Sequence, residues 1–120
     1  MILYKTVYVF GSENVEVFKD LITSTEVEPV HVRKLYVYET TSPRQGNGEL
    51  RLYIEREKIA EIPLVNFLDN LTNKNYVSQP VYEIDVEIPV GETLIAGLVS
   101  GSTATNIVVT IEYEIVGTRR

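Results

Sequence analysis

Carboxylates spaced two residues apart come closest to a functional site in this sequence. Glu83, Asp85 and Glu87 form one acidic stripe, and Glu112 and Glu114 form a second on a strand that could lie beside the first. Oxygen ligands on adjacent strands would suit Ca²⁺, which takes about six to eight of them. Side chains along a flat strand rarely converge, however, and calcium sites are normally built from loops. We therefore interpret both stripes as solvated outer faces and predict no metal site.

Other catalytic groups are scarce. His31 is the single histidine and the chain has no cysteine, which excludes disulfides, thiolate metal sites and a cysteine nucleophile. No Gly-x-Ser-x-Gly elbow, glycine-rich phosphate loop or His-Glu-x-x-His motif occurs. A carboxylate pair for glycoside hydrolysis would need a cleft and a separation that the sequence does not specify. We predict a protein that is not an enzyme, with no catalytic residue and no cofactor.

The length and composition limit what can position these side chains. A chain of 120 residues predicts one domain over residues 1–120. Its net charge of -6 disfavours nucleic acid, because phosphate binding needs clustered Lys and Arg. No apolar run approaches the roughly 20 residues of a membrane span and no signal peptide is evident, so we expect no membrane insertion and a place in the cytoplasm or a virion. The 14 Glu against 3 Asp, with no Cys, favour a thermophilic source.

The C-terminal third has the clearest strand pattern. Residues 82–88 alternate apolar and acidic side chains, which is typical of a strand with one buried face. Residues 93–99 are apolar on both faces and predict a central strand. Residues 107–115 alternate again. With turns between them, the three runs are interpreted as a β-meander within residues 81–116.

Two further runs are apolar on both faces and are candidates for contacts between subunits. Residues 2–10 place large apolar side chains on one face and smaller ones on the other. In residues 30–41, Leu35 and Val37 are expected on the opposite face from Val30 and Val32. Strands with apolar side chains on an exposed face invite pairing with another chain. The predicted subunit-contact residues are Ile2, Tyr4, Tyr8, Phe10, Leu35 and Val37.

Strand after strand with turn signals between them predicts an all-β fold. Turns recur about every 8 to 12 residues and no amphipathic helix stands out, which is typical of an antiparallel β-sandwich or barrel. The long loops before Val30 and Val81 fit connections that cross between two sheets. We therefore expect an antiparallel β-sandwich, with a jelly roll as first choice and an immunoglobulin-like arrangement as second.

Four segments resemble the small single jelly-roll structural proteins of viruses, including viruses that infect archaea and bacteria. They are residues 33–38, 49–63, 88–94 and 110–115, and the likeness lies in their strand and turn pattern. The resemblance implies a capsid, turret or decoration subunit that associates with itself, often about threefold or fivefold axes. It supplies no catalytic residue.

Two functions are carried forward. The first is a non-enzymatic structural subunit, a viral capsid or virion surface protein, that forms a homo-oligomer of three or more copies and contacts other virion proteins. The alternative is a carbohydrate-binding or adhesin-type module that uses the loop of residues 42–48 and nearby tyrosines. Tyrosine suits either role, because it combines apolar area with a hydroxyl group.

Overall fold

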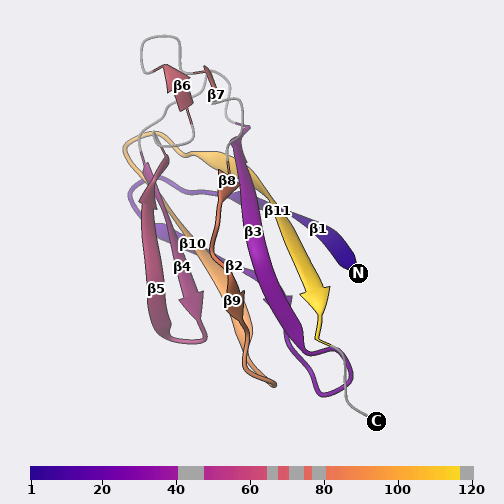
Figure 1. Cartoon of the computed structure of the whole chain (residues 1–120). Helices are drawn as coiled ribbons and strands as arrows, with labels where there is room; N and C mark the ends of the chain where they lie inside the picture. The colour runs from indigo at the N-terminus through magenta and orange to yellow at the C-terminus, as the bar shows by residue number, and fades with distance from the viewer. Residues whose placement is uncertain (41–47, 65–67, 71–74, 77–80, 117–120) are drawn as a thin grey trace.

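Two antiparallel sheets packed face to face form the fold (Figure 1). The computed structural model describes residues 1–40, 48–64, 68–70, 75–76 and 81–116. Sheet I has the order β1-β11-β3, and β8 and β9 follow one another along the far side of β3. Sheet II has the order β2-β10-β4-β5, and β6 pairs with β7 alone. The prediction of an all-β antiparallel sandwich is confirmed. The strands are β1 (Ile2–Phe10), β2 (Glu16–Thr23), β3 (Val30–Glu39), β4 (Gly48–Ile54), β5 (Glu57–Pro63), β6 (Leu68–Asn70), β7 (Asn75–Tyr76), β8 (Val81–Tyr82), β9 (Val86–Glu87), β10 (Thr93–Ser100) and β11 (Asn106–Ile115).

The core lies between the two sheets and consists of aliphatic side chains. Alternate residues of the long strands of the two sheets point inward, which follows from the two-residue period of extended backbone. Each fully buried Leu, Ile or Val contributes about 1.5–3 kcal/mol to folding relative to an exposed position. In a chain without cysteine, this packing replaces disulfides as the source of stability. Fully buried members include Val9, Leu21, Val32, Leu35, Leu50, Leu52, Leu94, Leu98, Ile107 and Ile111.

A β-bulge in β3 corrects one expectation from the sequence. The pairing of β3 with β11 passes over Arg33, which is an extra residue on β3. An extra residue shifts the alternation by one position. Leu35 and Val37 therefore share the inner face with Val32, and their side chains are 0% and 1% exposed. Their expected placement on a face available to a partner is wrong, because they fill the chain's own core.

The last third of the chain does not form the expected meander. β8 and β9 lie in sheet I, β10 lies in sheet II, and β11 returns to sheet I. The first run is also broken, because Asp85 adopts a left-handed conformation with φ of 45° between β8 and β9. The Asp85 N–H donates to the Arg33 carbonyl oxygen at 3.0 Å, which holds this kink against the bulge of β3. The prediction that residues 93–99 form a central strand is confirmed, since β10 lies between β2 and β4.

Candidate interaction surface

Four of the predicted contact residues form one apolar row on the outer face of β1. They are Ile2, Tyr4, Tyr8 and Phe10, here called the β1 row, and they are 40%, 62%, 55% and 65% exposed. The intervening Val9 points inward and is buried. The rings of Tyr8 and Phe10 stack with centroids 6.4 Å apart. The structure thus places these four side chains together at the surface, while Leu35 and Val37 lie in the core.

The backbone of β1 is open on one side. All nine residues of β1 pair with β11. Within the described residues, no strand pairs with the opposite side of β1. This leaves a row of backbone N–H and C=O groups that can accept another strand. The strand has no proline and no bulge, and Lys5 is its one charged residue.

The other sheet edges in the described part of the chain carry features that discourage pairing. β5 has three charged residues, ends in Pro63 and pairs with β4 through a bulge. β2 also has three charged residues and a bulge in its pairing with β10. β8 and β9 are two residues each. Charge, proline, bulges and short length are the usual protections of an edge strand, so β1 is the one long edge here that lacks them.

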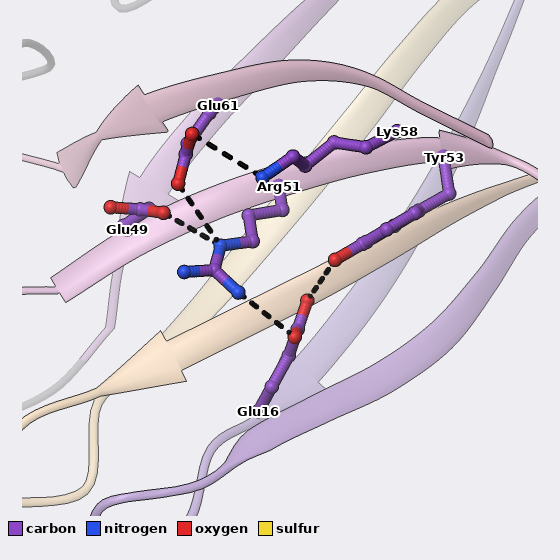
Figure 2. A network of polar contacts seen from close by, with 6 residues as sticks. All are labelled: Glu16, Glu49, Arg51, Tyr53, Lys58 and Glu61. Atoms are coloured by element: carbon purple, nitrogen blue, oxygen red, sulfur yellow. Dashed lines mark hydrogen bonds and ion pairs between the residues drawn. The ribbon is translucent and has the colours of Figure 1, made fainter. Parts of the chain in front are cut away.

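The outer face of sheet II carries a network of paired charges (Figure 2). Arg51 on β4 contacts three carboxylates: Nε lies 2.6 Å from Glu49 and 3.3 Å from Glu61, and Nη1 lies 3.1 Å from Glu16 on β2. Lys58 on β5 adds a 3.4 Å contact to Glu61. The hydrogen bond to Glu49, in particular, raises the pKa of the Arg51 guanidinium. Carboxylates of three strands therefore have cationic partners within the chain.

A glycine on the central strand makes room for this network. Gly97 on β10 lies between β2 and β4, and a Cβ there would collide with the Glu16 carboxylate and lie 2.9 Å from the Tyr53 ring. The Tyr53 hydroxyl donates to Glu16 Oε2 at 2.6 Å, across the backbone of β10. That bond is the main reason why the pKa of Tyr53 is raised. Gly97 thus permits side chains of β2 and β4 to meet over the strand between them.

The sequence reasoning missed this network. The alternation of Glu49, Arg51 and Tyr53 is visible in the sequence and indicates that the three side chains share a face. Their partner Glu16 lies 35 residues from Arg51 along the chain, so only the tertiary pairing of β2 with β10 brings it there. The local signal could have identified the face but not the partner.

The two acidic stripes do not lie side by side, because β3 separates β9 from β11. Basic side chains of β3 pair with both. His31 Nε2 lies 2.7 Å from Asp85, and Arg33 Nη1 lies 3.0 Å from Glu114. Hydrogen bonding with His31 lowers the pKa of the Asp85 carboxyl. In the part of the chain that the structure describes, no group of three or more His, Cys, Asp or Glu is arranged to hold a metal ion.

A shallow hollow of about 330 Å³ lies on sheet II beside the network. Its apolar part includes Phe18 and Tyr53, whose rings meet edge-on with centroids 5.6 Å apart. The loop predicted to present a carbohydrate site falls in residues 42–48, of which 42–47 lie outside the described residues. The residues that line the hollow are Phe18, Asp20, Tyr53, Glu55, Arg56 and Ile95.

Comparison of the chain with protein families, curated proteins and solved structures found no match. Among the described residues, no helix has the length and apolar character needed to cross a bilayer.

Proposed function

We propose that the chain is a non-enzymatic structural subunit that associates with copies of itself, as a capsid or virion surface protein does. The observation that carries the proposal is the open edge of β1 with its apolar row. Tyr4 and Phe10 are each more than half exposed on a strand whose outer backbone groups have no strand partner among the described residues. Association would pair that backbone and cover the part of the apolar row that lies against the neighbouring strand.

The charges favour β1 as the edge at which a second copy could bind. The chain carries a net charge of -6, so two copies repel each other wherever their acidic faces approach. β1 carries only Lys5, and its outer face meets a partner without bringing carboxylates of β1 together. On sheet II, Arg51 and Lys58 hold the carboxylates of Glu16, Glu49 and Glu61. Contact through β1 therefore has the smallest electrostatic cost of the sheet edges described here.

The order in which the strands are connected supports the resemblance to viral jelly-roll proteins. Apart from the β4–β5 hairpin, the successive long strands lie in different sheets: β1 to β2, β2 to β3, β3 to β4 and β10 to β11. An immunoglobulin-like sandwich has more pairs of successive strands that are neighbours in one sheet. The crossing pattern favours a jelly roll, the arrangement common in viral capsid domains. We expect an assembly of three or more copies, in contact with other virion proteins.

The test is the mass of the assembled protein measured by light scattering, with electron microscopy of the same sample. Adding carboxylates to the β1 row in the double variant Tyr8→Glu, Phe10→Glu should break the β1 contact and lower the mass of the assembly, because the copies are already acidic. The matched control is Phe18→Glu, which places a carboxylate at a similarly exposed aromatic position on the protected edge strand β2. It should leave association unchanged. Unaltered protein that stays monomeric at high concentration would refute the proposal.

The hollow on sheet II favours carbohydrate binding as a second candidate. Phe18 is 58% exposed and lies against Tyr53, with the charged Asp20 and Arg56 nearby in the same lining. Aromatic faces beside polar groups are the usual elements of a small-ligand site. A glycan array would show binding that is lost in Phe18→Ala and kept in Phe10→Ala. An array without any hit removes this candidate.

A further inference from the structure

We infer that β1 pairs with β1 of a second copy, antiparallel and centred on Thr6, so that the two copies of sheet I become one continuous sheet. This inference rests on the proposed self-association and adds its contact and register. In the proposed pairing a twofold axis runs through the Thr6–Thr6 pair, perpendicular to the sheet. Each β1 residue then lies opposite the residue of the partner's β1 for which the two residue numbers add up to 12, for example Tyr4 opposite Tyr8.

The residue pattern of β1 is symmetric about Thr6. On the outer face the strand reads Ile2, Tyr4, Thr6, Tyr8 and Phe10. Pairing about Thr6 places each Tyr4 opposite a Tyr8, each Ile2 opposite a Phe10, and Thr6 opposite itself. Aromatic and aliphatic pairs across neighbouring strands are among the pairs that stabilise antiparallel sheets. The row that is open to solvent in one chain is thus self-complementary.

Other registers are less favourable. Centring on Lys5 would place the two ammonium groups directly opposite each other, which is destabilising. Centring on Val7 would pair only residues 4–10 and leave Ile2 and Leu3 without an opposite residue. Centring on Thr6 pairs all nine residues of β1 and faces Lys5 with Val7, which has no charge. Lys5 therefore selects among registers and does not prevent pairing.

The antiparallel direction follows from the two faces of sheet I. A perpendicular twofold axis keeps the outer face of both copies on one side, so the two β1 rows are continuous. Parallel pairing of the same edge would need an axis along the strand, which turns one copy over and sets its inner face beside the outer row of the other. The inner residue Val9 is buried on the side that faces sheet II. Parallel pairing would therefore place sheet II of one copy on the same side as the outer face of the other copy. An isologous contact closes at two copies, so a larger assembly needs a second contact elsewhere.

A single cysteine reports the register, because the chain has none of its own. In the variant Thr6→Cys, the two cysteines would face each other across the twofold axis. Their Cα atoms would be about 4.5–5.5 Å apart, a separation that suits a disulfide. The control is Thr110→Cys, since Thr110 lies beside Thr6 on β11 with the two hydroxyl oxygens 3.2 Å apart. Two copies of Thr110 would be about 14 Å apart, three strand spacings, and could not be joined.

Mild oxidation of Thr6→Cys should give a disulfide-linked dimer as the main product, with a roughly tenfold lower yield from Thr110→Cys. A second measurement mixes Tyr4→Cys with Tyr8→Cys of different mass, and the expected product joins one of each. If light scattering shows oligomers but Thr6→Cys and the Tyr4–Tyr8 mixture give no more dimer than Thr110→Cys, the register is wrong and self-association stands. If every sample is monomeric and unlinked, both the register and the proposed function fall.

Discussion

The outer faces of the two sheets differ in whether their side chains have partners within the chain. On sheet II, Arg51 gathers carboxylates from β2, β4 and β5, and Gly97 leaves space for the contacts. On β1 of sheet I, Tyr4 and Phe10 project into solvent beside an edge with no strand partner in the described residues. The face of sheet II pairs charged groups within the chain, and β1 leaves both apolar area and backbone groups available to a partner.

This difference is confined to one strand and does not extend over all of sheet I. At the opposite edge of sheet I, His31 pairs with Asp85. In the middle of the sheet, Arg33 on β3 pairs with Glu114 on β11. These charged side chains have partners within the chain, as do those of the network on sheet II. Among the sheet edges in the described residues, β1 combines open backbone groups with a row of exposed apolar side chains, so a contact between copies is expected there.

The largest expected effect is on the free energy of unfolding, and it distinguishes a residue needed for folding from one needed for association within sheet I. Leu35→Ala removes a fully buried side chain and should lower the free energy of unfolding by about 2–5 kcal/mol. Tyr4→Ala, on the exposed β1 row, should change the unfolding free energy of the monomer by less than about 0.5 kcal/mol while it weakens association. Urea unfolding at a concentration below that of association, paired with light scattering, measures both. Equal losses of stability in the two variants would contradict the inner placement of Leu35.

The next effect breaks the network on sheet II. Gly97→Ala inserts a methyl group where the Glu16 carboxylate and the Tyr53 ring now lie, so both side chains must move. Overpacking of this kind costs about 1–3 kcal/mol, and urea unfolding measures the loss. Thr6→Ala provides the control on the outer face of β1, where the replacement creates no overlap and removes only the exposed hydrogen bond with Thr110. If Gly97→Ala is as stable as the unaltered protein, Gly97 has no steric role in the network.

The sequence predicted the class of fold because alternation records which side of a strand is buried. It identified β10 as central and the inner face of β11, where Ile107 and Ile111 are buried. It failed at β3, since the bulge at Arg33 is set by pairing with β11 and has no local signature. The meander failed for a similar reason: the pattern of a strand shows that one face is covered, but not which sheet it joins.

The candidate site was predicted in part. The β1 row was recognised because four large apolar side chains share one face of residues 2–10, and the structure places them on that face and exposes them. That β1 is an edge with no strand partner among the described residues depends on the order of the whole sheet, which the strand's own sequence does not contain. The role of these residues in contacts between copies stays a prediction.

The smallest effect concerns the paired charges at the edge of sheet I opposite β1. Asp85→Asn keeps a residue that tolerates the left-handed conformation, with φ of 45°, and removes only the charge that faces His31. Because the bond with His31 lowers the pKa of Asp85 in the folded protein, the carboxylate stabilises the fold above its ordinary pKa of about 3.9. That contribution is lost as the pH falls through the lowered value. Urea unfolding should show the unaltered protein more stable than Asp85→Asn at about pH 5, by less than the effect of Gly97→Ala, and the difference should vanish towards about pH 2. A difference in stability that persists at low pH would mean that Asp85 acts through backbone conformation and not through its charge. The pairing of charges within the chain would then not distinguish the edge opposite β1 from β1 itself.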